Sequence, residues 1–347
     1  MTKPWVFMSH RIGHDGYGYA GMCISKALGQ EGIAAESIDL LVNAGHSAEA
    51  EHTWYVNGPG MAMCVADWYP EIHAQPLVGH TMFESTKQPE YRISMLNGCE
   101  VACVVPCEWC AEMFEAQGVR VPIHVVKWGM DPDDYYPLDR SDRRNGPYVF
   151  LWHGTPDRRK GWDVAYRAFF KAFGKNQTQY RSGDVQLIMH FRELPGGLAG
   201  AADQNVTVYS GYYSREGMRQ MMRAADAFVY PARGEGWGLP PREAAATGLP
   251  VLATRWGGLA EEINEWAYPI EVAGTSPAEY GAWQAGDVGE WAEPSLSHTV
   301  ELMRWLFDHR EEAAATALRR SEWLRTQTTW RRTARGLAEV MRKVQGC

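Results

Sequence analysis

This sequence has no long apolar run, no net positive charge and no disordered composition, and each absence excludes a class of protein. No apolar run approaches the ~18–20 residues that a helix needs to span a bilayer, so no stable membrane insertion is expected. The formal net charge of −8 offers no general attraction to nucleic acid or to an anionic membrane. With 45% apolar and 22% charged residues, the composition is that of a globular protein.

The start of the chain and its cysteine content bear on where in the cell the protein is expected. No signal peptide is evident, because Met1–Pro4 runs directly into a strand-like apolar segment at Trp5–Ser9. The seven cysteines are an odd number in a long chain of intracellular type, which favours free thiols over disulfides. We therefore expect a soluble, cytoplasmic protein.

The length and the pattern of apolar segments predict two domains. A chain of 347 residues exceeds the size of one typical core. Strand-like and helix-like segments alternate, which predicts α/β domains with parallel sheets wrapped by helices. The polar, turn-rich stretch Asp139–Pro147 has the composition of a linker. We predict a Rossmann-like domain at 1–140 and a second one at 141–320, with a cleft between them.

The last segment, 321–347, has the clearest helical periodicity. We expect one long helix that packs back across both domains and braces them. The overlapping segment Arg319–Lys343 carries eight basic and two acidic residues, which indicates a solvated helix face or, alternatively, a patch for an anionic acceptor. The apolar seam follows alternating steps of four and three residues along Trp323, Gln327, Trp330, Ala334, Leu337, Met341 and Val344.

Two carboxylates flank a glycine-rich turn in the stretch Pro231–Glu243. Glu235 follows the apolar run Ala227–Tyr230, and Glu243 lies one turn into the next predicted helix. A carboxylate at the carboxyl end of a strand lies where open α/β sheets bind ligands. The glycines between the two let the backbone approach a ligand and offer N–H groups to an anion. This stretch predicts a sugar-nucleotide site.

A series of segments, in order along the chain, resembles the large retaining glycosyltransferase family 4 of the GT-B fold. The resemblance covers nearly the whole chain and is most specific from Glu235 to Glu243. It implies two Rossmann-like domains, a donor site mainly in the second, and transfer of a hexose-type sugar with retained configuration. Members usually need no metal, so we expect no cofactor, with a UDP- or GDP-sugar as co-substrate. The matching segments are Pro106–Trp109, Gly118–Val119, Trp128–Pro132, Arg159–Gly161, Ala225–Val229, Gly234–Pro240, Glu243–Ala244 and Gly257–Leu259.

The resemblance assigns roles in the second domain. Arg159 and Lys160 stand where the family binds the donor diphosphate, and cations held there stabilise the departing nucleoside diphosphate. Glu235 resembles the carboxylate that holds the sugar hydroxyls, and Glu243 the one that binds the ribose hydroxyls. The other expected donor contacts are Gly236, Trp237, Gly238, Leu239, Gly257, Gly258 and Leu259.

One phosphate contact of the family is missing. The family often has an arginine shortly after the first strand of the second domain, and Trp152–Gly154 takes that place here. We expect His153 or Arg158 to contact the phosphate instead.

Two groups in the first domain also match the family. Gly16, Tyr17 and Gly18 follow the opening strand and are expected to approach the diphosphate, although a plain turn is an alternative. His80 is expected to hydrogen-bond the sugar 6-hydroxyl or to polarise the reaction centre, the alternative being a core histidine. No nucleophile is identified in this domain, which favours attack on the leaving group's own face.

The acceptor stays open. A saccharide, a small metabolite, a protein side chain and a hydroxylated DNA base are all candidates. Trp54, Tyr55, Trp68 and Tyr69 could stack on a sugar or a base, or pack in the core. Other classes also remain: a GT-B phosphorylase or hydrolysing epimerase, or a nucleotide-sugar binder without catalysis.

Two patterns resemble metal sites, and we expect a metal at neither. Cys103, Cys107 and Cys110 have the C-x3-C-x2-C spacing of a radical-SAM cluster. Cys103 falls in a predicted buried strand, however, and would point away from the other two, so core or capping thiols are favoured. Asp131 and Asp133 resemble a D-x-D motif, but Pro132 lies between them and the family has a similar turn without metal.

Overall fold

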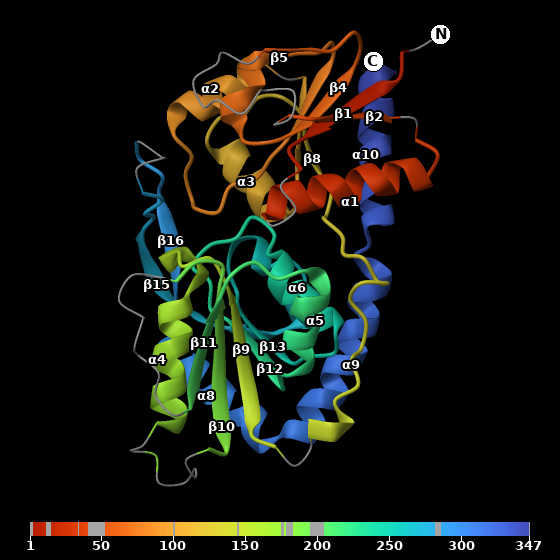
Figure 1. Ribbon diagram of the computed structural model, residues 1–347. Helices are drawn as coiled ribbons and strands as arrows, with labels where there is room; N and C mark the ends of the chain where they lie inside the picture. Colours follow the sequence, from red (N-terminus) through yellow and green to blue (C-terminus); the bar gives the residue numbers. More distant parts are fainter. Residues whose placement is uncertain are drawn as a thin grey trace. The chain divides into compact units, whose positions relative to one another are not determined.

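The computed structural model describes residues 3–11, 15–33, 35–40, 53–99, 101–143, 146–174, 177, 183–194, 205–281 and 286–346. The chain forms two compact units (Figure 1). The predicted boundary at residue 140 differs from the division after Gly129. The first unit comprises Met1–Gly129, Tyr280–Gly289 and Thr328–Cys347, and the second comprises Met130–Glu279 and Glu290–Gln327.

The first unit is built on a six-stranded parallel sheet in the order β2-β1-β4-β6-β7-β8. These strands are β1 (Trp5–Ser9), β2 (Ala35–Asp39), β4 (Gly60–Met63), β6 (Leu77–His80), β7 (Ala102–Val105) and β8 (Ile123–Val125). Strands β1, β4, β6 and β7 are buried along their whole length, as expected for a parallel sheet covered on both faces. The other elements are α1 (Gly16–Gln30), α2 (Glu90–Cys99), α3 (Glu108–Ala116), α10 (Trp330–Gln345), the 3-10 helix η1 (Ala66–Glu71), β3 (Trp54–Tyr55) and β5 (Ile72–His73).

The second unit has its own six-stranded parallel sheet, in the order β11-β10-β9-β12-β13-β14. Its strands are β9 (Tyr148–Gly154), β10 (Val185–Phe191), β11 (Val206–Ser210), β12 (Ala227–Tyr230), β13 (Val251–Thr254) and β14 (Tyr268–Ile270). The chain starts in the middle of this sheet, runs to one edge, and returns to build the other half. This is the doubly wound arrangement that the alternation of segments predicts.

Helices cover both faces of this second sheet. Figure 1 shows α4 on one side of the strands and α5, α6 and α9 on the other. Helix α4 packs on α8, and α6 packs on α9. The elements outside the sheet are η2 (Ser141–Arg143), η3 (Arg158–Lys160), α4 (Trp162–Phe173), α5 (Arg215–Arg223), α6 (Leu239–Ala246), η4 (Gly257–Leu259), α7 (Ile263–Trp266), the antiparallel pair β15 (Val272–Pro277) and β16 (Glu290–Pro294), α8 (Leu296–Asp308) and α9 (Arg310–Gln327).

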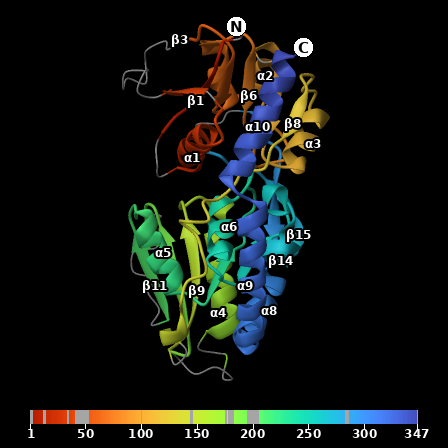
Figure 2. The ribbon, with the colours of Figure 1, turned by 90° about the vertical axis from the view of Figure 1, so that its right-hand side faces the viewer.

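The prediction of one continuous helix at 321–347 is wrong. Helix α9 ends at Gln327 in the second unit, and α10 begins at Trp330 in the first, where it packs on α1 (Figure 2). Thr329 between them has extended backbone, and its Oγ1 accepts a hydrogen bond from the N–H of Arg332. A threonine in this role is an N-cap, which begins a new helix while the apolar spacing continues unchanged.

None of the helices in the described part of the chain has the length and apolar character that crossing a membrane requires.

Candidate functional site

The predicted donor residues of the second unit gather at one edge of its sheet. The strand order reverses between β9 and β12, and ligands of doubly wound sheets bind outside the carboxyl ends of the strands at such a reversal. His153 lies near the end of β9, Glu235 follows β12, and Gly257 begins η4 after β13. The fold therefore brings residues far apart in sequence to the position where a ligand is expected.

Glu235 is the centre of a cluster of charged and polar groups. Its Oε1 accepts hydrogen bonds from Lys160 Nζ (2.5 Å) and from the Tyr230 hydroxyl (2.7 Å). Arg159 Nη1 lies 3.6 Å from Oε2. Burial alone would raise the pKa of Glu235, but the charges of Lys160 and Arg159 outweigh it and hold this pKa below its usual value. Glu235 is therefore an ionised, buried acceptor of hydrogen bonds.

A close backbone contact holds Lys160 beside Glu235. Asp157 caps η3 by accepting a hydrogen bond from the N–H of Arg159 (2.8 Å). Gly161 follows with a φ of 69°, and a Cβ atom on it would lie 1.8 Å from the carbonyl oxygen of Pro231. Only glycine tolerates both conditions, so Gly161 lets the backbone after Lys160 pack directly against the loop that carries Glu235.

The two predicted glycine-containing turns, at Gly236–Gly238 and at Gly257–Gly258, pack against each other through their backbones. The N–H of Gly258 donates to the carbonyl of Glu235 (2.7 Å), and a Cβ atom on Gly258 would lie 2.2 Å from the carbonyl oxygen of Gly236. Gly238 has a φ of 84° and is the N-cap of α6, with Leu259 packed against it. The segments 236–239 and 257–259 therefore form one closely packed cradle beside Glu235. Within it the N–H of Leu259 donates to the carbonyl of Trp256 (3.2 Å), so the N–H groups of Gly258 and Leu259, both expected to receive a phosphate oxygen, are used for backbone hydrogen bonds.

Arg242, which the sequence pattern did not single out, holds this cradle together. Its guanidinium lies 3.9 Å from the ring centre of Trp237 and 4.5 Å from that of Trp266, so it is sandwiched between two indoles. It donates to the carbonyls of Trp237 and Gly258 (2.8 Å to the latter) and is buried. Trp237 thus supports the turn through Arg242. The sequence signal was an arginine next to Glu243 in an otherwise apolar helix.

Arg233 anchors the loop that carries Glu235, and the sequence pattern missed it as well. The side chain is 2% exposed. Its Nη1 and Nη2 donate to the two carboxylate oxygens of Asp163 (2.7 and 2.8 Å), and its Nε donates to Glu293 (3.1 Å). Nη1 also donates to the carbonyl of Arg158 (2.7 Å). One buried guanidinium thus ties η3, α4, β16 and the Glu235 loop together.

Glu243, the second carboxylate of the pattern, has different surroundings. It is buried on α6 and forms a hydrogen bond with Tyr135. Burial raises its pKa to about 7, although the Tyr135 hydrogen bond and the charge of Arg215 oppose this shift. Glu235 is therefore fully ionised at neutral pH, whereas Glu243 is divided between its neutral and ionised forms.

The structure places His153 and Arg158, the two expected phosphate contacts, in other interactions. His153 Nδ1 lies 2.8 Å from His190 Nδ1, and burial lowers its pKa to about 3, so it is neutral. Arg158 Nη2 lies 3.3 Å from Glu293, and Nη1 lies 3.7 Å from Glu279. His153 is thus a neutral ring that could reach a phosphate only as a hydrogen-bond donor, and Arg158 shares its charge with two carboxylates.

In the first unit, Gly16, Tyr17 and Gly18 form the first turn of α1. Asp15 caps this helix and accepts a hydrogen bond from the N–H of Gly18 (2.7 Å). The Tyr17 hydroxyl accepts a hydrogen bond from the N–H of Met82 (3.0 Å), just beyond β6. Burial raises the pKa of Tyr17 well above its usual value, so it remains a neutral hydroxyl. The turn is therefore tied to the strand that carries His80.

His80 is fully buried at the end of β6, and its protonation state follows from one contact. The indole N–H of Trp128 can only donate, and it lies 2.9 Å from His80 Nε2. His80 must therefore accept at Nε2 and carry its proton on Nδ1. Burial lowers its pKa to about 3, so the ring is neutral. Nδ1 has no hydrogen-bond partner among the residues that the structure describes, which leaves one N–H for a hydroxyl or carbonyl group.

The aromatic residues considered for the acceptor differ in burial. Tyr69 is fully buried. Trp54 and Trp68 are half-buried and stack on each other, with ring centres 6.0 Å apart. Tyr55 is exposed and stacks on His73 (4.9 Å). Core packing thus accounts for Tyr69, while Trp54 and Trp68 are partly exposed and Tyr55 is exposed.

The residues of the two metal-like patterns are buried or hydrogen-bonded within the protein. Cys103, Cys107 and Cys110 are buried free thiols. Asp131 accepts a hydrogen bond from the N–H of Asp133 (3.0 Å). Within the described ranges, no group of three or more His, Cys, Asp or Glu side chains is arranged to hold a metal ion.

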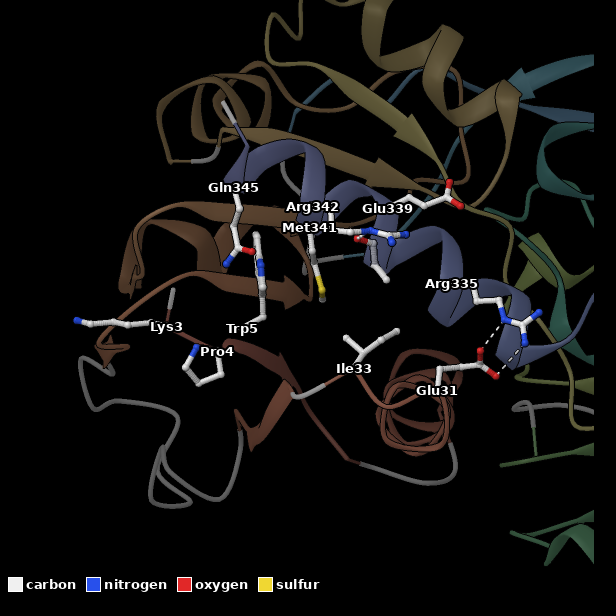
Figure 3. A pocket seen from close by; sticks show the side chains of 11 residues that line it. Lys3, Pro4, Trp5, Glu31, Ile33, Arg335, Glu339, Met341, Arg342 and Gln345 are labelled. Atoms are coloured by element: carbon white, nitrogen blue, oxygen red, sulfur yellow. Dashed lines mark hydrogen bonds and ion pairs between the residues drawn. The ribbon is translucent and has the colours of Figure 1, made fainter. Parts of the chain in front are cut away.

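A cavity of about 610 Å³ opens in the first unit away from all predicted site residues (Figure 3). It lies between the start of β1, the end of α1 and α10, and Trp5 and Met341 are among its lining side chains. Two glutamates line it, Glu31 and Glu339, and Glu31 is paired with Arg335 (2.5 Å). The cavity contributes nothing to the donor cluster.

Comparison with known proteins supports a single family. A sequence profile described as "Family 4 Glycosyltransferase in conflict systems" matches residues 103–337. The chain is 29% identical over 209 residues to a D-inositol 3-phosphate glycosyltransferase of Acidothermus cellulolyticus, in an alignment that covers 54% of this chain and 44% of that relative. The alignments cover about half the length of the curated relatives that the chain matches. In four of them the covered share of the relative is 41% to 49%.

Solved structures resemble the chain over nearly its whole length. HepE of Anabaena, in complex with UDP and glucose, has a TM-score of 0.65 at 13% identity and covers 98% of this chain and 99% of its own. Sucrose-phosphate synthase of Thermosynechococcus elongatus has a TM-score of 0.70 at 15% identity, with 99% of both chains covered. Such likeness shows the fold, and the predicted α/β GT-B fold is confirmed. Since the family profile matches more than half of the chain, the protein belongs to the family 4 glycosyltransferases of conflict systems.

Proposed function

We propose that this protein is a retaining glycosyltransferase that moves a hexose-type sugar from a nucleoside-diphosphate sugar to a hydroxyl group. The observation that carries this proposal is the cluster of Lys160, Arg159 and Glu235 at the reversal of strand order. It combines cations suited to a diphosphate with a carboxylate suited to sugar hydroxyls. A UDP-sugar is the leading donor, because HepE, which shares the fold, is described with UDP and with UDP-glucose.

The reaction exchanges one bond at the anomeric carbon for another. The bond from this carbon to the donor phosphate oxygen breaks through an oxocarbenium-like state, and a bond to the acceptor oxygen forms on the same face. The acceptor's hydroxyl proton passes to the departing phosphate oxygen. Arg159 and Lys160 stabilise the charge that accumulates on the leaving group. His80 donates its Nδ1 proton in a hydrogen bond to a sugar hydroxyl and stays neutral throughout.

We propose a small saccharide or polyol phosphate as the acceptor. This proposal is supported by relatives whose names contain a polyol phosphate, D-inositol 3-phosphate, and a sugar phosphate, mannosylfructose phosphate. The basic segment Arg319–Lys343 gives little support for DNA. Arg331 and Arg335 both pair with Glu31 (2.7 and 2.5 Å), and Arg320 lies over the ring of Tyr268 (4.1 Å). These arginines serve internal contacts.

A donor screen tests the proposal. Thermal unfolding is measured with the UDP, GDP, ADP and TDP conjugates of glucose, and we expect the UDP-sugar to raise the melting temperature by several degrees at saturating concentration. The same donor is then incubated with D-inositol 3-phosphate or fructose 6-phosphate. We expect release of UDP and a product whose anomeric proton coupling, measured by NMR, shows retained configuration.

Other outcomes would identify another class of protein. Turnover with inorganic phosphate and no nucleotide would indicate a phosphorylase. Saturable donor binding with neither transfer nor hydrolysis would indicate a binding protein. Transfer to hydroxymethylated DNA in preference to the sugar phosphates would move the acceptor to nucleic acid. An inverted product would rule out the retaining mechanism.

The raised pKa of Glu243 predicts that nucleotide binding depends on pH. An ionised carboxylate accepts ribose hydroxyl groups better than the neutral acid does, so binding favours the ionised form and releases a proton below pH 7. Affinity should therefore increase as pH rises through the pKa of about 7. Between pH 6 and pH 8 we expect about a tenfold gain for the preferred nucleoside diphosphate, measured by titration calorimetry.

Glu243→Gln is the control for this titration. The terminal phosphate also ionises near neutral pH, but it does so equally with both proteins. The difference in pH dependence between wild type and Glu243→Gln therefore isolates the carboxyl group. If both proteins gain affinity equally with pH, Glu243 does not bind the ribose as proposed.

A further inference from the structure

The donor diphosphate requires more positive charge than Arg159 and Lys160 leave available. Both contact Glu235, whose negative charge cancels one of their two positive charges. A nucleoside diphosphate carries more than one negative charge on its phosphates, and those charges increase on the leaving group during transfer. We propose that Arg192 binds the donor diphosphate and takes the place of the phosphate-binding arginine that is missing after β9. This inference rests on the proposed function.

The register of the sheet places Arg192 at the required position. Strands β9 and β10 are parallel, with Gly154 opposite Phe191, the last residue of β10. The N–H of Arg192 then donates to the carbonyl of Gly154 (3.2 Å). Arg192 therefore leaves the carboxyl edge of the sheet beside residue 155, directly after β9. Strands β10, β9 and β12 are consecutive in the sheet, so this is the edge at which Glu235 also lies.

The charge of Arg192 acts on groups that surround the donor position. Burial is the main cause of the raised pKa of Glu243 and of Tyr230, and Arg192 lowers both. Burial also dominates the low pKa of His153, to which Arg192 adds. The guanidinium thus lies within electrostatic reach of the proposed ribose ligand and of the hydroxyl that holds Glu235.

The side chain of Arg192 is available for a ligand. It is half-buried, and within the described residues it forms no ion pair and donates no side-chain hydrogen bond. A partly desolvated cation without a counter-ion is unfavourable in a folded protein. A bound diphosphate would supply the missing counter-charge and two or more acceptor oxygens for the guanidinium.

Binding measurements on matched variants test this assignment. Wild type is titrated with UDP, GDP, ADP and TDP by calorimetry, and the tightest of the four is taken to the variants together with its parent nucleoside. We expect Arg192→Gln to weaken diphosphate binding by about 10- to 100-fold and to leave nucleoside binding within about twofold. Arg192→Lys should lose less, since it keeps the charge but not the forked geometry. Arg167→Gln, which removes an exposed charge from α4, is the control and should bind like wild type.

Each contrary result has a separate meaning. If Arg192→Gln binds the diphosphate within twofold of wild type, the assignment is wrong while the proposed function stands. If it loses nucleoside and diphosphate affinity equally, Arg192 acts at the ribose or base, and the assignment is again wrong. If wild type itself binds none of the four nucleotides, the proposed function fails and this inference fails with it.

Discussion

Arg233→Ala is expected to lower the free energy of unfolding by about 3–5 kcal/mol, the usual result of breaking a buried ion pair by removing one partner. The guanidinium of Arg233 makes a two-pronged contact with Asp163 and a further one with Glu293. Removing it leaves two carboxylates close together without their shared cation. The measurement is urea denaturation followed by tryptophan fluorescence.

A second arginine of the same unit provides the control. Arg255 is exposed, and its Nε is 4.0 Å from Glu271. Arg255→Ala should cost less than about 0.5 kcal/mol, as is typical of exposed ion pairs. Arg233→Lys should recover little of the lost stability, because an ammonium group cannot make the two-pronged contact. Equal effects of Arg233→Ala and Arg255→Ala would contradict the role given to Arg233.

Glu235→Ala is expected to reduce kcat by about 100-fold or more, the magnitude typical of losing a group that stabilises the transition state directly. The same variant should bind the nucleoside diphosphate as tightly as wild type, or more tightly. Glu235 competes with the diphosphate for Lys160 and Arg159, and its removal releases both cations. Initial rates of UDP release and calorimetric titration with UDP measure the two effects separately.

Glu243→Ala is the matched comparison, since it removes the other carboxylate of the same pattern. It should weaken nucleotide binding, and its kcat at saturating donor should fall much less. If the two variants show the same ratio of lost kcat to lost affinity, the division of roles between Glu235 and Glu243 is wrong. If both are as active as wild type, the carboxylates do not form the donor site.

Much of the fold was predictable because it depends on local patterns. Trp5–Ser9 and Ala227–Tyr230 are strands with the bounds of their apolar runs. The proximity of Glu235 to Lys160 also followed from sequence, since both segments match one family, and Gly161 after Lys160 requires close backbone contact with Pro231. Such a pattern is visible in the sequence because only glycine fits where two backbones come this close.

The supporting arginines were not predictable for the opposite reason. Arg233, Arg242 and Arg192 each depend on partners or neighbours far along the chain, and an isolated arginine in sequence looks like a surface residue. Only the sheet register places Arg192 beside Gly154. The break at Thr329 was missed because the apolar seam continues across it, and the capping hydrogen bond leaves no trace in hydrophobic spacing.

The position of α10 has a consequence for biosynthesis. In the first unit Trp330 packs against Tyr19 of α1, with ring centres 6.3 Å apart, although some 300 residues separate them. A ribosome delivers residues 130–327 before α10, so the second unit can complete its core while α1 still has an uncovered apolar face. The first unit, whose opening segment is translated first, therefore completes its core last. Until the final helix emerges, that face is open to chaperones or to aggregation.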